Sequence, residues 1–165
     1  EAGVSLRSLY VHFDDLEALF VAAAERHTDR LAALVGPLVI EGDLDTRIEA
    51  LMSRNAPLYE AGAGVRRAAL LQEPFSPALQ QALTLGRKLA RSTIRQMFAP
   101  ELAAAGPEAG EALGRALEIA TSAATWDALR TFQQLNVEAA TDQVREMVLA
   151  FLTRWGPSTG NGRQG

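Results

Sequence analysis

Two histidines, His12 and His27, are the side chains of this chain that most readily take part in metal or acid–base chemistry. They belong to different predicted helices, and neither has a His, Asp or Glu partner at the spacing of metal ligands. The sequence also lacks a glycine-rich phosphate loop, a Gly-x-Ser-x-Gly elbow and the Glu-x-x-His pairs of a di-iron bundle. We therefore expect no catalytic residue, no metal site and no cofactor, and we do not expect an enzyme.

Polar side chains on apolar helix faces predict a different kind of site, a small-molecule pocket. Asn55 and Tyr59 follow Met52 at one and two turns of the same predicted helix. The candidate ligand-binding residues are His27, Met52, Asn55, Tyr59, Arg87, Thr121, Thr125 and Trp126. Ordinary structural roles are open as well: Tyr59 and Trp126 as core or interface aromatics, Arg87 on a solvated face, and His27 as a semi-buried histidine.

A short motif near the start of the chain is more specific than these scattered polar residues. Ala2-Gly3-Val4-Ser5 is followed by Leu9-Tyr10, by His12-Phe13 and then by Leu19. This order resembles the signature of the TetR family of transcriptional regulators, in which the corresponding helix is the second half of a helix-turn-helix and reads DNA. The match is specific but covers only residues 2–19, and the resemblance of the remaining chain is weaker.

The resemblance implies which side chains would contact DNA. Those residues are Ser5, Arg7, Ser8, Tyr10, Val11 and His12. Of these, Arg7, Ser8 and Val11 would approach base edges, and Arg7 is the best candidate for guanine because its guanidinium can reach O6 and N7 together. Tyr10 and His12 would contact phosphates, although Tyr10 could instead pack against the next helix. The family usually has a lysine where this chain has Leu16, so one phosphate contact per subunit is missing.

Two aspartates directly follow the motif, where a polyanionic partner would disfavour them. Asp14 and Glu17 form an Asp-x-x-Glu pattern similar to a capping box, and Asp15 adds negative charge to a first turn. We therefore expect a new helix to begin here and to run from Asp15 to about Val35, where Gly36-Pro37 follows.

The remaining sequence predicts further helices and no strand. Ser76-Pro77 is a strong helix start, because serine caps free N–H groups and proline is tolerated at the first position. Asn136 is a second expected cap. The expected helices run from Asp45 to a break at Gly62 and Gly64, and over Val65–Gln72, Pro77–Phe98, Pro107–Leu135 and 137–155.

The last two expected helices carry apolar positions at three- and four-residue steps, which must be covered by something. One interpretation is that both helices pack inside a single domain. The other, which the family resemblance also implies, is that they form half of a four-helix bundle between two subunits. The candidate dimer-interface residues are Leu117, Ala124, Val144, Met147, Val148, Phe151, Leu152 and Trp155.

Composition limits where DNA could be bound. The net charge is -4 and the calculated pI is about 5.2, so a contact with DNA must be local. No apolar run approaches the roughly 20 residues of a membrane span, and no basic leader precedes the apolar residues. We therefore expect a cytoplasmic protein without a membrane partner. Its expected parts are a DNA-binding remainder with a connecting helix (1–35), a helical ligand-binding and dimerisation domain (36–156) and a disordered tail (157–165).

Together with the resemblance, these patterns predict an all-α, homodimeric transcriptional regulator with a partial helix-turn-helix followed by a TetR-like domain. It would act as a repressor that a small-molecule effector releases from palindromic operator DNA. The alternative is a helical homodimer that binds a small molecule or a protein partner without recognising DNA. Leu16 and the acidic flank favour this alternative.

Overall fold

The computed structural model describes residues 6–38 and 40–155, with side chains from Glu17 onward except Leu19. This part of the chain is helical and contains no strand. No helix within it combines the length and the hydrophobicity of a membrane span. The elements are α1 (Leu6–Ala32), α2 (Leu44–Gln72), the short 3-10 turn η1 (Glu73–Phe75), α3 (Pro77–Met97), α4 (Ala99–Ala105), α5 (Pro107–Ala120), α6 (Ala123–Asp127), the π-helical turn η2 (Ala128–Phe132) and α7 (Val137–Trp155).

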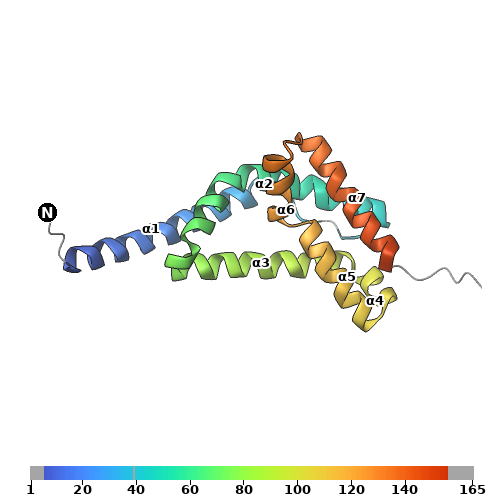
Figure 1. The fold of residues 1–165 in the computed structure, drawn as a ribbon, viewed down its shortest axis with the longest axis horizontal. Helices are drawn as coiled ribbons and strands as arrows, with labels where there is room; N and C mark the ends of the chain where they lie inside the picture. The colour runs from blue at the N-terminus through green and yellow to red at the C-terminus, as the bar shows by residue number, and fades with distance from the viewer. Residues whose placement is uncertain (1–5, 39, 156–165) are drawn as a thin grey trace, which may run out of the picture.

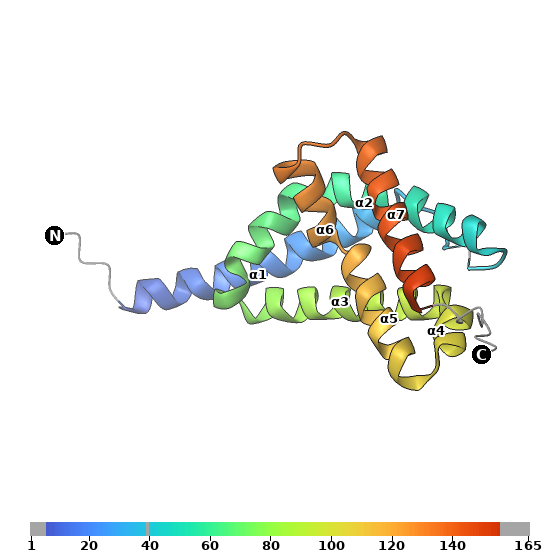
Figure 2. The same cartoon turned by 45° about the vertical axis from the view of Figure 1, so that its right-hand side comes forward.

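The helices form a body from which one end of α1 projects. Figure 1 shows the N-terminal half of α1 extending beyond every other helix, while its C-terminal half lies along α2. Helices α5 and α7 pack against the opposite end of the body, and the turned view in Figure 2 shows α3 joining the two ends. The core lies between α2, the end of α3, α5, α6 and α7. Its largest fully buried side chains are Trp126, Phe98, Ile48, Leu51, Met97, Leu113, Leu117 and Val148.

The expected boundary between a reading helix and a connecting helix is not found. Asp14 and Asp15 lie inside α1, which is continuous over 27 residues, so the predicted helix start at these aspartates is wrong. The stretch contains no Gly or Pro, and nothing local outweighs the tendency of its residues to continue the helix. The helix ends at Ala32, three residues before the expected end at Val35.

The predicted break at Gly62 and Gly64 is also wrong, because α2 runs through both glycines. Gly62 is buried against α1, where a Cβ atom would lie 3.5 Å from His27 Nε2 and 3.7 Å from Leu31 Cδ1. Packing of α1 at this point offsets the helix-weakening effect of glycine, which is on the order of 1 kcal/mol. The expected separate helix at Val65–Gln72 is therefore the last part of α2.

The start of α3 agrees with the sequence. Ser76 caps the helix by accepting a hydrogen bond from Leu79 N at 3.2 Å, and Pro77 occupies the first position. The helix ends at Met97, close to the expected end. Pro100 does not simply stop the chain, because it lies in the first turn of the short helix α4. Asn136 likewise caps α7 by accepting a hydrogen bond from Ala139 N at 2.8 Å.

The long helix expected from Pro107 to Leu135 is broken after Ala120. Thr121 turns its hydroxyl back to the Leu117 carbonyl (2.8 Å), and Ser122 caps α6 by accepting a hydrogen bond from Thr125 N at 3.1 Å. Short hydroxyl side chains compete in this way with regular helical hydrogen bonds. The chain then continues as α6 and the π-helical turn η2, which gives the segment before α7 a different direction from α5 (Figure 2).

A buried ion pair joins the beginning of α2 to the junction of α3 and α4. Arg47 is 6% exposed, and its guanidinium donates hydrogen bonds to the Met97 carbonyl and to both Glu101 carboxylate oxygens. Burial by itself raises the pKa of Glu101, but the hydrogen bond and the charge of Arg47, together with a backbone hydrogen bond, outweigh it, so the pKa is lowered. The pair therefore fixes three helices relative to one another.

The contact between α4 and α5 leads to a matched prediction about two buried glycines. A Cβ at Gly110 would lie 2.4 Å from the Leu102 carbonyl oxygen, whereas at Gly114 it would make ordinary contacts with the flexible end of Arg95 at 3.6 Å and with the Leu102 side chain at 3.7 Å. Alanine is better than glycine in a helix by about 0.5–1 kcal/mol. We expect Gly114→Ala to raise the free energy of unfolding in urea by about that amount and Gly110→Ala to lower it, because α4 must move. A gain in both variants would contradict the close α4–α5 contact.

Candidate functional site

The largest buried side chain of the core, Trp126, marks the place where three candidate ligand residues meet. Its ring centre lies 6.0 Å from that of Tyr59 on α2, with the ring planes inclined at 50°. The Tyr59 hydroxyl donates a hydrogen bond to the Thr121 carbonyl at 2.7 Å. Tyr59, Thr121 and Trp126 therefore meet between α2 and the segment that joins α5 to α6.

A carboxylate outside this aromatic pair receives both a ring N–H and a guanidinium. Trp126 Nε1 donates to Glu60 Oε1 at 2.7 Å, and Arg130 of η2 donates to both Glu60 oxygens at 2.9 and 3.0 Å. The Arg130 hydrogen bond is the first cause of a lowered pKa for Glu60. Arg130 also donates to the Leu135 carbonyl, so it joins the π-helical turn both to α2 and to the segment that follows the turn.

A second ion pair closes the other side of the cluster. Arg66 donates to the Asp127 carboxylate at 2.7 and 3.2 Å, and its guanidinium carbon lies 5.8 Å from the centre of the Tyr59 ring. Arg66 also lies over Gly62, beside His27 of α1. We call Tyr59, Glu60, Arg66, Trp126, Asp127 and Arg130 the polar cluster. It connects α2, α6 and η2, and Arg66 brings it close to His27 of α1.

The other predicted ligand residues are distributed differently. Met52 and Asn55 are buried on α2, and Met52 belongs to the apolar core. Thr125 donates its hydroxyl hydrogen to the Ile119 carbonyl at 2.5 Å, so it serves the break between α5 and α6. Arg87 does not reach the cluster. Its side chain is exposed and pairs with Glu73 at 2.8 Å.

Most polar groups of the cluster are engaged within the protein, which limits what they can do for a ligand. The Tyr59 hydroxyl, the Trp126 ring N–H and both carboxylates have the partners given above. Burial raises the pKa of Tyr59 to about 12, so its phenol stays neutral at ordinary pH. The cluster is therefore a helix-joining network. Among the described side chains, no group of three His, Asp or Glu is placed to hold a metal ion.

A more open surface lies along the middle of α3. Both ends of its apolar face are buried, at Leu79 and at Met97, but the same face is exposed between them at Gly86 and Ala90. A Cβ at Gly86 would have no neighbour within 4 Å, and Leu89 beside it is 60% exposed. The ribbons show α3 standing apart from α2 and α6 here (Figures 1 and 2). This stretch of α3 is the candidate ligand-contacting surface.

Two hollows occur near the C-terminal part of α3. One lies between α3, α4 and α5 and is lined by Arg95, Leu102, Ala103, Gly106, Pro107, Gly110 and Glu111. Another follows α3 over Lys88, Arg91, Ser92, Arg95, Gln96 and Ala99. Their arginines already pair with carboxylates, Arg91 with Glu118 and Arg95 with Glu111. These hollows therefore offer no free cluster of positive charge.

The predicted DNA-contacting residues can be placed only in part. Arg7, Ser8, Tyr10, Val11 and His12 belong to the projecting end of α1, but their side chains lie outside the described part of the structure. Ser5 lies outside the described residues altogether. Within α1, Glu17 is the first side chain that is described, and it accepts a hydrogen bond from the Ser76 hydroxyl at 2.8 Å.

The eight candidate dimer residues divide into two groups. Four of them are buried in the core of the single chain: Leu117, Val144, Val148 and Leu152. Their burial agrees with the interpretation that the last helices pack inside one domain, and a dimer that uses these four positions stays a prediction. Ala124 is exposed, and Met147, Phe151 and Trp155 are only partly buried.

Four residues of the polar cluster were not predicted: Glu60, Arg66, Asp127 and Arg130. Each ion pair joins positions about 60 or 70 residues apart in the sequence, and no local pattern marks such a pairing. A weak signal exists, since Glu60 is the neighbour of Tyr59, and Asp127 is the neighbour of Trp126.

Comparison of the chain with models of protein families, with curated proteins and with solved structures finds no match.

The raised pKa of Tyr59 predicts a loss of stability in alkali. An unfolded tyrosine ionises near pH 10, whereas folded Tyr59 resists ionisation until about pH 12. The neutral phenol therefore stabilises the fold below about pH 10, and this contribution disappears as the pH rises towards 12. We expect the urea midpoint to fall over this range, and to fall less in Tyr59→Phe.

At neutral pH, Tyr59→Phe should lower the free energy of unfolding by about 1 kcal/mol, because the hydrogen bond to the Thr121 carbonyl is lost.

Proposed function

We propose that the chain is a homodimeric, ligand-responsive DNA-binding regulator of transcription, and that it represses until a small-molecule effector releases it from palindromic operator DNA. The observation that carries this proposal is the motif in residues 2–19, together with the position of its helical part at the projecting end of α1 (Figure 1). A helix end that stands clear of the body is sterically free to enter a major groove.

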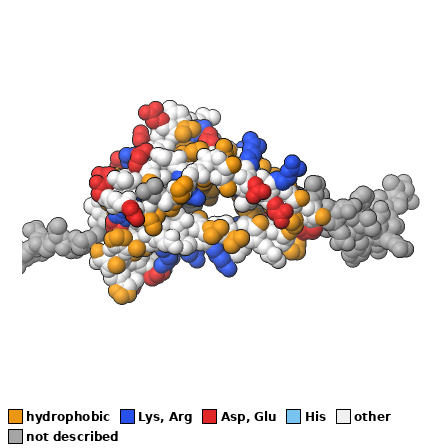
Figure 3. Space-filling view, turned by 180° about the vertical axis from the view of Figure 1, so that it is seen from behind, with side chains coloured by type: hydrophobic (Ala, Val, Ile, Leu, Met, Phe, Trp, Pro, Cys, Tyr) orange, Lys and Arg blue, Asp and Glu red, His pale blue; other side chains and the backbone are white. Residues whose placement is uncertain are grey.

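The distribution of charge supports a DNA contact that is confined to this end. Figure 3 shows acidic, basic and apolar side chains interspersed on one face of the body, without a broad basic surface. With a net charge of -4, nonspecific attraction to phosphates is weak, so recognition would depend on the few side chains of the motif.

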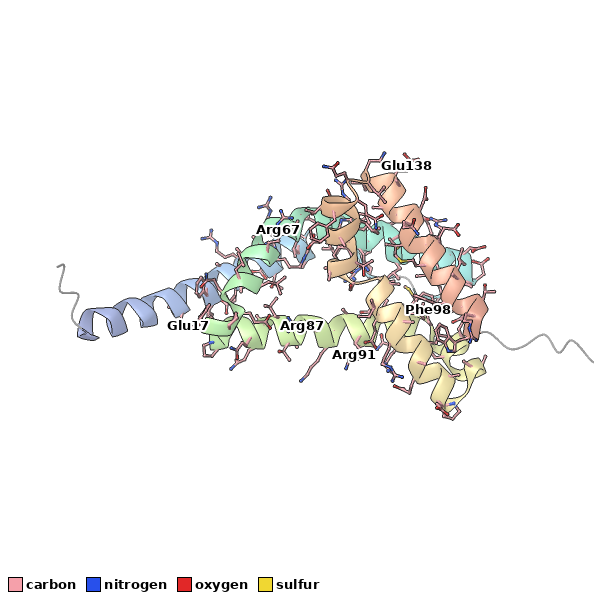
Figure 4. The ribbon with its side chains drawn as sticks, viewed as in Figure 1. Glu17, Arg67, Arg87, Arg91, Phe98 and Glu138 are labelled. Atoms are coloured by element: carbon pink, nitrogen blue, oxygen red, sulfur yellow. The ribbon has the colours of Figure 1, made fainter. Side chains whose placement is uncertain are left out.

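Two contacts fix α1 to the body and would carry a signal between ligand and DNA. Glu17 binds the Ser76 cap of α3, and about three turns later α1 crosses α2 at Gly62. Figure 4 shows Glu17 at the point where α1 leaves the body. A ligand held beside the exposed middle of α3 would alter the position of α3 or α2 and therefore the direction of α1. The ligand must bind one arrangement better than the other for this to occur.

Dimerisation would use the outer side of the last helices. Partly buried apolar side chains remain there at Met147, Phe151 and Trp155 of α7, and Phe132 of η2 is 84% exposed. In a two-fold dimer the same surface meets itself, and the two reading helices would lie about one turn of DNA apart, roughly 34 to 36 Å.

DNA footprinting with Arg7→Ala tests the function directly. We expect the full-length protein to protect a palindromic site upstream of its own coding sequence at low salt, and Arg7→Ala to lose sequence preference while remaining a dimer, because a bidentate contact to guanine is worth about 1–3 kcal/mol. Arg26→Ala is the matched control, since Arg26 is an exposed arginine on the part of α1 that lies along the body. Lack of protection by the wild-type protein would favour the alternative, a helical dimer that binds a small molecule or a protein without DNA.

Leu16 gives a second prediction, which concerns salt. Replacing it by lysine, as Leu16→Lys, should add one phosphate contact per subunit and steepen the dependence of log affinity on log salt by about one unit per contact. Leu16→Gln is the control, because it is polar but carries no charge. An unchanged salt slope in Leu16→Lys would place residue 16 away from the DNA backbone.

A further inference from the structure

Where α1 crosses α2, two basic side chains lie above one glycine. A Cβ at Gly62 would lie 3.4 Å from an Arg66 guanidinium nitrogen and 3.5 Å from His27 Nε2. The imidazole and the guanidinium therefore share the small space that the missing side chain leaves. Leu31 of α1 fills its apolar side.

The charges that act on His27 have the same sign. Arg30 lies one turn further along α1, and Arg66 is contributed by α2. α3, which also packs against α1, contributes none of the charges acting on His27 within the described part of the chain. Asp127 of α6 is engaged with Arg66 at 2.7 Å, so it holds that guanidinium in place beside the imidazole. A proton on His27 would place a third positive charge at this contact.

We propose that His27 is a proton-sensitive latch, which holds α1 on α2 while the imidazole is neutral and releases α1 when it becomes protonated. Neutral imidazole can lie next to a guanidinium without repulsion, and it loses little by partial burial. Imidazolium must be desolvated next to two cations. Because Arg66 is tied to the polar cluster, α1 is the element that moves.

The direction of the pH response follows from the environment of His27. Partial burial first, and then Arg30 and Arg66, lower its pKa below the usual value of about 6.5. The neutral form therefore stabilises docking fully above about pH 6.5, and this contribution is lost as the pH falls through the lowered pKa. Docking should be tight in neutral solution and should loosen in mild acid.

The latch can act without any DNA function, but its effect on DNA rests on the proposed function. Release of the crossing at Gly62 leaves α1 attached through its contacts with α3, among them the hydrogen bond between Glu17 and Ser76, so the projecting end can change direction. In a DNA-binding dimer, this would lower operator affinity in acid.

Paired spin labels measure the docking of α1 directly. The chain has no cysteine, so Ala22→Cys on α1 and Arg67→Cys on α2, both at exposed positions, give unique labelling sites. We expect a single narrow distance between the labels near about pH 8, and a second, broader population near about pH 5. His27→Gln should remain in the narrow distribution at both pH values, whereas His27→Lys should show the broad population already at about pH 8.

Arg30 separates a charge effect from loss of packing. Arg30→Gln removes one of the charges that lower the pKa of His27, without touching the Gly62 contact, so that pKa should rise towards its usual value. Because the docked-state pKa is then less depressed, the acid-induced loss of docking should become smaller. Arg30→Glu should reduce that loss further. The imidazole resonances of His27, assigned in a His12→Gln background, report its pKa in each variant.

The outcomes decide between two clear cases. Equal pH responses of the wild-type protein and His27→Gln, or no change of the His27 pKa in Arg30→Glu, would overturn the latch. If the latch holds but operator affinity does not vary with pH, the proposed DNA function is at fault and the latch is not. Should His27→Lys fail to fold by circular dichroism, the glutamine variant and the two Arg30 variants still decide the matter.

Discussion

A single buried guanidinium determines how the helical body is assembled. Arg47 is almost inaccessible to solvent, and a charge in that position is tolerated only with partners of good geometry. Its partners are the last carbonyl of α3 and a carboxylate in the first turns of α4, so α2, α3 and α4 share one arrangement in which all three groups are satisfied. The short helix α4 then meets α5 at Gly110, where the backbones approach too closely for a side chain. Helix α5, positioned in this way by α4, packs against α7 in the apolar core.

The polar cluster and the exposed middle of α3 have different mechanical roles. Around Trp126, ion pairs and hydrogen bonds join α2 to α6 and η2, and they leave few groups free for a ligand. Along α3, by contrast, the described side chains leave apolar surface exposed between two buried ends. The structure therefore combines a hydrogen-bonded joint between α2, α6 and η2 with a stretch of α3 whose side chains are exposed.

The features that were predictable from sequence are those with local causes. Ser76 and Asn136 cap their helices because side chain and backbone are three residues apart, and Ser122 carries the same signal for α6, although the surrounding alanines favoured an unbroken helix. The continuity of α2 through Gly62 was not predictable, since its cause is the packing of α1. The same holds for the site. The meeting of Tyr59 with Trp126 followed from expected helix convergence, but the pairing of Arg66 with Asp127 spans 61 residues. The pairing of Arg87 with Glu73 was not predictable either, because the two residues belong to different helical elements.

Helix α3 is packed against the body at its two ends and is exposed in its middle turns. Its first turn is fastened by the Ser76 cap and Leu79, and its last turn by Ile94 and Met97, while the turns between them have few tertiary neighbours. Local opening of those central turns breaks helical hydrogen bonds but exposes hardly any additional apolar surface, so it costs much less than opening either end. The backbone amides around Gly86 should therefore exchange with solvent deuterium well before those at the two ends. The span of α3 would open and close many times within the lifetime of the folded body.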